Sequence, residues 1–117
     1  MGQFKPFRGT AIVVEDDPTQ REMIALLLQE SDFDVIQCED AETAALALKR
    51  HPALLVTDVN LAGHMDGIEL THITRRTDPN VHVIVVSSIP PASALPDGTV
   101  FFPKPIHPVA LIREATH

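Results

Sequence analysis

Residues 10–18, Thr-Ala-Ile-Val-Val-Glu-Asp-Asp-Pro, join a short β-branched apolar run to three consecutive acidic residues and a proline. The apolar run predicts a buried strand, and Pro18 is well placed in the first turn of a following helix. Neighbouring carboxylates repel one another, and burying one is costly unless a positive charge compensates it. The three acids therefore lie either in a solvated turn or around a cation.

The order of strand and then helix recurs along the whole chain. Apolar residues fall on one face of the first helix at Ile24, Leu27 and Leu28, and the other helices show similar stripes. Strands that are apolar on both faces, each followed by a helix, indicate a parallel sheet covered on both sides. Strands are predicted at 10–15, 34–39, 53–59, 81–88 and 98–102, and helices at 18–32, 41–51, 66–77 and 107–117.

Length and composition limit the classes of protein that fit. The chain has 117 residues, of which 44% are hydrophobic, so it can bury the core of one α/β domain. The net charge of −7 argues against a main role in binding nucleic acid or an anionic membrane. A single cysteine, Cys38, excludes an internal disulfide framework. We expect one domain over 1–117, with residues 1–8 as an N-terminal extension, in the cytoplasm.

Polar side chains follow most of the predicted strands at the point where each strand ends. In doubly wound sheets, ligands bind beyond the carboxyl ends of the strands, where the strand order reverses. We therefore expect these side chains to converge on one rim of the sheet. They are Glu15, Asp16, Asp17, Asp58, Ser87, Ser88 and Lys104.

This set of side chains suits a hard divalent cation and phosphoryl chemistry. Mg²⁺ prefers oxygen ligands and typically uses one or two carboxylates, here Asp16 and Asp58. An ionised Asp58 can act as a nucleophile on phosphorus, while Lys104 and the Ser87 hydroxyl neutralise or bind phosphoryl oxygens. Neither GxxxxGK[ST] nor GxGxxG is present, which argues against a nucleotide-binding phosphate loop.

Five motifs, in this order along the chain, resemble those of the receiver domain of two-component response regulators. Their spacing is also similar to that of the family, which has the fold of the chemotaxis regulator. The resemblance matches Glu15 and Asp16 to the acidic pair, Asp58 to the phosphoacceptor and Lys104 to the invariant lysine. The motifs are VVEDDP (13–18), LLVTDV (54–59), MDGIEL (65–70), VIVVSS (83–88) and FFPKPI (101–106).

The resemblance implies a flavodoxin-like fold with strand order 2-1-3-4-5. It also implies that a sensor histidine kinase or a phosphotransfer protein donates a phosphoryl group to Asp58 in an Mg²⁺-dependent reaction. The direct ligands of Mg²⁺ would be Asp16, Asp58 and the backbone carbonyl of Asn60, with Glu15 acting through water. Such a protein is not an enzyme on a separate substrate, because it catalyses only its own phosphorylation and dephosphorylation.

The resemblance further implies a conformational switch. Ser87 would move toward the phosphoryl group and Phe101 would rotate inward to fill the space that it leaves. The Lys104–Pro105 peptide bond is expected to be cis, which only an X-Pro bond allows at small cost. Whether the chain forms a homodimer stays open, as does its downstream protein partner.

Two segments depart from the family pattern. The loop that follows Asp58 is one residue longer than the commonest form, although Asn60 keeps its place. The segment between Ser87 and Lys104 is short and contains Pro90, Pro91 and Pro96, so the family's fourth helix is expected to be very short or irregular. We also hypothesise that apolar Ile89 hinders an attacking water and lengthens the lifetime of the acyl phosphate.

Simpler interpretations and other functions compete with this one. Asp17 and its neighbours could cap the following helix, since acids stabilise helix N-termini. A receiver fold could also bind partners without phosphorylation, as a protein-interaction module. A third candidate is an Mg²⁺-dependent phosphatase with an aspartate nucleophile, but Asn60 occupies the place where such enzymes carry a general acid.

Overall fold

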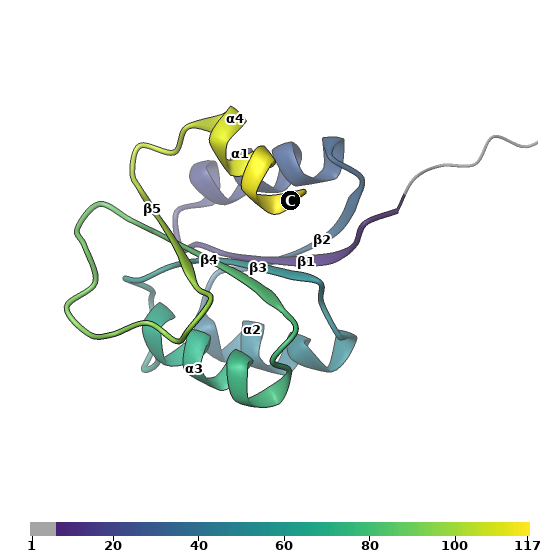
Figure 1. Ribbon diagram of the computed structural model, residues 1–117. Coiled ribbons are helices and arrows are strands. Elements are labelled where there is room, and N and C mark those ends of the chain that lie inside the picture. The colour runs from purple at the N-terminus through teal and green to yellow at the C-terminus, as the bar shows by residue number, and fades with distance from the viewer. Residues whose placement is uncertain (1–6) are drawn as a thin grey trace, which may run out of the picture.

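The computed structural model describes residues 7–117, so residues 1–6 of the predicted N-terminal extension lie outside the described part. Strands and helices alternate along the described part of the chain, except that no helix separates the last two strands (Figure 1). The strands are β1 (Gly9–Val14), β2 (Phe33–Cys38), β3 (Leu54–Asp58), β4 (His82–Ser87) and β5 (Val100–Pro103). The helices are α1 (Pro18–Glu30), α2 (Ala41–Ala47), the 3₁₀-helix η1 (Leu48–Arg50), α3 (Gly67–Thr77) and α4 (Pro108–Ala115).

All five strands are parallel and form one sheet in the order β2-β1-β3-β4-β5. Figure 1 shows α1 and α4 on one face of this sheet and α2 and α3 on the other. The doubly wound α/β architecture and the order 2-1-3-4-5 are therefore confirmed. The strand order reverses beside β1 and β3, so the polar residues that follow these two strands lie at the switch point of the sheet.

The sheet is buried on both faces, and successive residues of β1 show this most clearly. Ala11 and Val13 pack with α1 and α4, whereas Ile12 and Val14 pack with α2 and α3. All four side chains are essentially inaccessible to solvent. Burial on both faces explains the continuous apolar runs from which the parallel sheet was predicted.

Three of the helices are preceded by an aspartate that caps their first turn. The side chain of Asp17 accepts a hydrogen bond from the backbone N–H of Thr19 at 2.9 Å, and Asp40 and Asp66 cap α2 and α3 in the same way. Each cap satisfies backbone donors that the first turn of a helix leaves unpaired. The capping interpretation of Asp17 is thus correct for its side chain.

One helix ends earlier than predicted, and one segment lacks a regular helix as predicted. The helix predicted over 41–51 is α-helical only to Ala47 and then tightens into η1, after which His51 adopts a left-handed conformation with φ 50°. No helix forms in residues 88–99, all of which the structure describes, so the prediction of an irregular segment there is confirmed. The label α4 accordingly belongs to the last helix, and Figure 1 shows a long loop between β4 and β5.

Within residues 7–117, no helix combines the length and the apolar composition that crossing a membrane requires.

Candidate functional site

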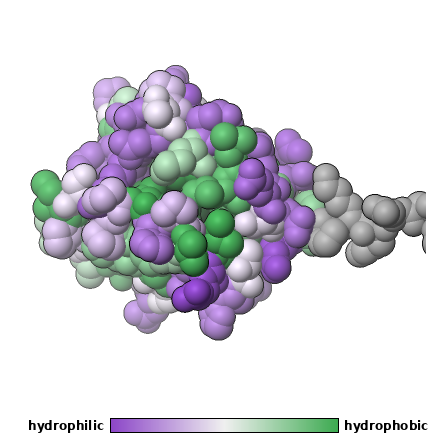
Figure 2. Space-filling view, turned by 90° about the horizontal axis from the view of Figure 1, so that it is seen from above, coloured by the Kyte–Doolittle hydropathy of each residue, from purple (hydrophilic) through white to green (hydrophobic). Residues whose placement is uncertain are grey.

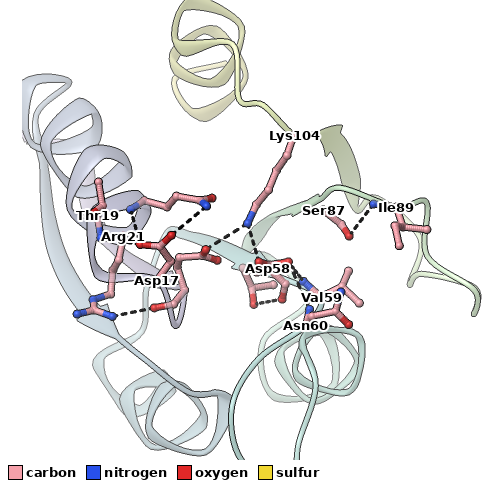
Figure 3. A network of polar contacts seen from close by, with 12 residues as sticks. Asp17, Thr19, Arg21, Asp58, Val59, Asn60, Ser87, Ile89 and Lys104 are labelled. Atoms are coloured by element: carbon pink, nitrogen blue, oxygen red, sulfur yellow. Dashed lines mark hydrogen bonds and ion pairs between the residues drawn. The ribbon is translucent and has the colours of Figure 1, made fainter.

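The ends of β1 and β3 and the segment after β5 bring three charged side chains into direct contact. The Lys104 ammonium donates to Oδ2 of Asp58 at 2.7 Å and to Oε1 of Glu15 at 3.1 Å. Figure 3 shows Lys104 reaching from the β5 end toward Asp58, with Ser87 on the neighbouring strand. The predicted convergence of these residues on one rim is therefore observed.

Asp58 is held in place by backbone groups that follow it. Its Oδ1 atom accepts hydrogen bonds from the N–H groups of Val59 at 2.6 Å and Asn60 at 3.3 Å. The side chain is buried, with 7% of the residue exposed. A methyl group on Gly67 would lie 1.8 Å from the Asp58 carbonyl oxygen, so only glycine allows α3 to begin this close to the end of β3.

The acidic side chains form a set of oxygen donors that fits a divalent cation. One carboxylate oxygen from each of Glu15, Asp16 and Asp58 lies within 4.8 Å of the other two. Glu15 is buried, and its Oε2 atom has no hydrogen-bond partner among the described residues. Asp16 is exposed at the mouth of the cluster. Hard oxygen ligands around a buried, unpaired carboxylate oxygen match the requirements of Mg²⁺.

The charges of the cluster perturb one another strongly. Burial, together with a hydrogen bond and repulsion from Asp58, raises the pKa of Glu15 from 4.5 to about 7, although Lys104 opposes this shift. Burial tends to lower the pKa of the Lys104 ammonium, but its hydrogen bonds to Asp58 and Glu15 outweigh this, and the pKa is raised. Lys104 therefore stays positively charged at neutral pH.

Ser87 lies on β4, the strand next to that of Asp58, and Phe101 lies on β5, one strand further from Asp58. Ser87 is buried at the end of β4, and its hydroxyl oxygen accepts a hydrogen bond from the N–H of Ile89 at 3.3 Å. Phe101 is half-buried in β5 and packs against the α2–α3 side of the core. Ile89 itself is 68% exposed. The Ser87 hydroxyl is thus tied to the segment that begins at Ser88.

Comparison with known families identifies the chain. Residues 11–114 match the model of the response regulator receiver domain. This chain belongs to the response regulator receiver family. Receiver domains of known structure share its fold over nearly all of the chain. A response regulator receiver protein from Sinorhizobium medicae covers 92% of this chain and 90% of its own, with a TM-score of 0.83 and 21% identity.

Two further relatives support the assignment to the receiver family. The receiver domain of the hybrid histidine kinase CckA is 27% identical, with a TM-score of 0.80, and the match covers 92% of this chain and 96% of that one. A protein-glutamate methylesterase/protein-glutamine glutaminase of Nitrosospira multiformis is 37% identical over 93 residues, which are 77% of this chain. The match spans only 25% of that relative, so the likeness concerns a part of it.

The remaining predicted residues of the receiver site have distinct positions. The Lys104–Pro105 peptide bond is cis, as the family resemblance implied. Asp17 caps α1 and does not belong to the three-acid cluster. Asn60 is exposed beside Asp58, to which its N–H group donates.

Two residues that support the receiver site were not predicted. The Arg21 guanidinium donates to the carbonyl oxygen of Glu15 at 2.9 Å and so fixes the turn between β1 and α1. Arg21 lies one turn inside α1 and contacts a backbone atom. A contact of this kind leaves no motif in the sequence. Gly67 was noticed only as part of the MDGIEL motif, yet its lack of a side chain is what lets α3 approach Asp58.

Proposed function

We propose that this receiver domain accepts a phosphoryl group on Asp58 and passes the signal on through a change of conformation. The donor would be a phosphohistidine of a sensor histidine kinase or of a phosphotransfer protein. The observation that carries the proposal is the contact of Lys104 with Asp58 at 2.7 Å, in a cluster with buried Glu15 and exposed Asp16. A partly buried lysine shared by two buried carboxylates is costly as a purely structural element, and groups perturbed in this way gather at functional sites.

The chemistry assigns Asp58 the role of nucleophile. A carboxylate oxygen of Asp58 attacks the phosphorus of the phosphohistidine, an O–P bond forms, and the P–N bond breaks. The electron pair of that bond goes to the imidazole nitrogen of the donor, which then takes a proton. Attack of water on the acyl phosphate later releases inorganic phosphate and restores Asp58.

The other residues of the rim position and neutralise the reacting groups. The Lys104 ammonium, already beside Asp58, would follow the negative charge as it passes to the phosphoryl oxygens. The backbone N–H groups of Val59 and Asn60 hold the carboxylate in one orientation. When Mg²⁺ is bound by Asp16, Asp58 and the Asn60 carbonyl, with Glu15 acting through water, it supplies charge neutralisation at the phosphoryl group.

The conformational change would begin at Ser87. The Ser87 hydroxyl now accepts a hydrogen bond from the Ile89 N–H group, and it must turn away from that group to reach a phosphoryl group on Asp58. This movement would release the start of residues 88–99 and open space for Phe101 beside β4. The charge of one added phosphoryl group would thereby shift the equilibrium between two conformations of this region.

The phosphodonor needs a surface next to the rim, and the structure offers an apolar one. Figure 2 shows apolar side chains gathered on the face formed by α1 and α4. A groove of about 700 Å³ runs along α1 past Met23 and Leu26, and a second hollow beside it reaches Lys104 and Ile106. Met23 and Leu26 are 39% and 48% exposed. We assign this face to the donor protein, which can there bring a histidine to Asp58.

A phosphorylation assay tests the proposal. Wild-type protein is incubated with acetyl phosphate and Mg²⁺, and the intact mass is measured beside Asp58→Asn. Asp34→Asn, an exposed aspartate on β2, serves as the matched control. The expected result is the mass of one added phosphoryl group on the wild type and on the control, lost when Mg²⁺ is chelated or Asp58 is replaced.

Other outcomes would favour the competing functions. Absence of phosphorylation, together with no spectral response to beryllofluoride and Mg²⁺, would favour a protein-interaction module. Turnover of a generic phosphate monoester would favour a phosphatase. It would contradict our proposal of a cytoplasmic signalling protein that acts only on its own aspartate. For the donor surface, Met23→Glu should slow transfer from a phosphorylated histidine phosphotransfer domain and leave acetyl phosphate labelling unchanged.

A further inference from the structure

We propose that Glu42 is a positioning residue for the metal site, because it fastens the loop between β3 and α3. This inference rests on the proposed function, since the loop carries Asn60, whose carbonyl oxygen we assign to Mg²⁺. Glu42 lies in the first turn of α2, on a different element from every residue of the acidic cluster. It acts through the loop and does not touch the reacting groups.

The Glu42 carboxylate contacts the middle of the loop. Its Oε2 atom accepts a hydrogen bond from the backbone N–H of His64 at 2.9 Å. Gly63 lies directly against the same carboxylate, because a Cβ atom placed there would come within 2.8 Å of Oε2 and 3.0 Å of Oε1. Gly63 has a φ of +94°, a conformation that other residues rarely adopt. A glycine at this position therefore allows the loop to lie on the Glu42 carboxylate.

The contact is close enough to cover the carboxylate. Oε1 of Glu42 is buried and has no hydrogen-bond partner among the described residues. Burying an unpaired carboxylate oxygen costs free energy, so the packed loop must offset that cost. A surface glutamate with no role in the loop would turn into solvent instead.

Glu42 completes a series of anchors along the loop. At the base, the N–H of Gly67 donates to the carbonyl of Val59 at 2.8 Å, and a short parallel bridge joins Ala62 to Asp40. Glu42 then holds the residues that follow Ala62. Asn60 lies between the first two anchors, so the direction of its carbonyl depends on where the rest of the loop is held. The additional residue of this loop makes such a restraint more important, since a longer loop has more conformations to lose.

Three variants test the role of Glu42. Glu42→Ala removes the acceptor, and Glu42→Gln keeps an oxygen that can accept from His64. The matched control is Glu69→Ala, which removes an exposed first-turn acid from α3, the other helix at this loop. For each protein we would titrate Mg²⁺ by calorimetry, measure phosphorylation by acetyl phosphate against Mg²⁺ concentration, and measure hydrogen exchange of the His64 amide without metal.

The expected result separates positioning from general stability. Glu42→Ala should raise the Mg²⁺ dissociation constant about 10-fold, as loss of an outer-shell partner does, and leave the rate at saturating Mg²⁺ little changed. Its His64 amide should exchange faster, whereas Glu42→Gln and Glu69→Ala should resemble the wild type.

An unchanged Mg²⁺ affinity in Glu42→Ala, with a wild type that binds the ion, would overturn this inference alone. An equal loss of rate at all Mg²⁺ concentrations would also overturn it, because that is the mark of a structural role. A wild type that neither binds Mg²⁺ nor is phosphorylated would overturn the inference and the proposed function together.

Discussion

The loop after β3 and the segment after β4 start from neighbouring strands at the same rim, yet they are held very differently. Residues 59–66 are fastened to the Asp58 carboxylate, to Asp40, to Glu42 and to the start of α3. Residues 88–99 carry three prolines, which have no N–H to donate. Ile89 donates to Ser87, and the carbonyl of Ala94 lies 3.2 Å from a ring nitrogen of exposed His72.

We infer from this difference that the two regions have separate tasks in the proposed function. A site that binds a metal and orients a nucleophile needs a fixed backbone, and the loop after β3 provides one. A switch needs an element that breaks few stabilising contacts when it moves. Residues 88–99 make few hydrogen bonds and are mostly exposed, so they fit this requirement. Leu95 of that segment is partly buried and packs against the same core cluster as Phe101, so movement of one is expected to reach the other.

The largest effect should follow from removing the positive charge of the fixed region. Lys104→Ala leaves Glu15 and Asp58 without their shared counter-ion and the phosphoryl group without one partner. Phosphorylation by acetyl phosphate at saturating Mg²⁺ should slow about 100-fold or more, as loss of a preorganised donor does. Circular dichroism would check that the variant folds, and a rate close to that of the wild type would contradict the assigned role.

The buried acid of the fixed region should make stability depend on pH. The pKa of Glu15 is about 7 in the folded protein and 4.5 ordinarily, so protonation stabilises the fold. Its contribution is complete below pH 4.5 and is lost as the pH rises through about 7. Without Mg²⁺, the free energy of unfolding of the wild type should fall by about 3 kcal/mol relative to that of Glu15→Gln as the pH rises through this range.

Urea denaturation of both proteins at several pH values, with a chelator present, measures this difference. Parallel stability curves for the wild type and Glu15→Gln would show that folding does not raise the pKa of Glu15, and would contradict this prediction.

Hydrogen exchange can test the comparison between the two regions directly. Beryllofluoride and Mg²⁺ together imitate the acyl phosphate. On their addition, the exchange rate of amides in residues 88–99 should change about 10-fold, whereas amides in residues 59–66 should exchange at the same rate or more slowly. Asp58→Asn should abolish both responses. A response confined to 59–66 would mean that the proline-containing segment does not switch.

The smallest expected effect concerns Ile89, an exposed residue near the start of residues 88–99. Ile89 is exposed beside Ser87, where its side chain can obstruct a water that approaches the acyl phosphate. Ile89→Ala and Ile89→Lys should therefore shorten the lifetime of the phosphorylated protein by a few-fold, of order 1 kcal/mol in the barrier. Release of inorganic phosphate from purified phosphoprotein measures it, and equal rates for all three proteins would rule out the hindrance.

Most of the rim could be predicted from the sequence because parallel strands end together. Once β1, β3 and β5 are recognised, Glu15, Asp58 and Lys104 must lie at one edge, and the structure joins them through two hydrogen bonds. The irregular segment after β4 was also predictable, since its prolines leave room for at most one or two helical turns near residues 92–95.

The supports of the site were not predictable because they depend on the path of the backbone. Arg21 and Glu42 bind backbone atoms of Glu15 and His64, which no pattern of side-chain types reveals. The early end of α2 at Ala47 likewise reflects how η1 and His51 turn the chain toward β3, whereas the apolar stripe continues to Leu48. The sequence thus identified the reacting groups better than the contacts that hold them.

A titration of the metal-free protein with Mg²⁺, followed by backbone NMR, tests the central claim most directly. The account predicts saturable shifts at residues 15–17, 58–60 and 104, which are far apart in sequence but meet at one rim, and the loss of these shifts in Asp58→Asn. Spectra that do not change with Mg²⁺, or change equally in Asp58→Asn, would contradict a metal-assisted phosphoacceptor at Asp58.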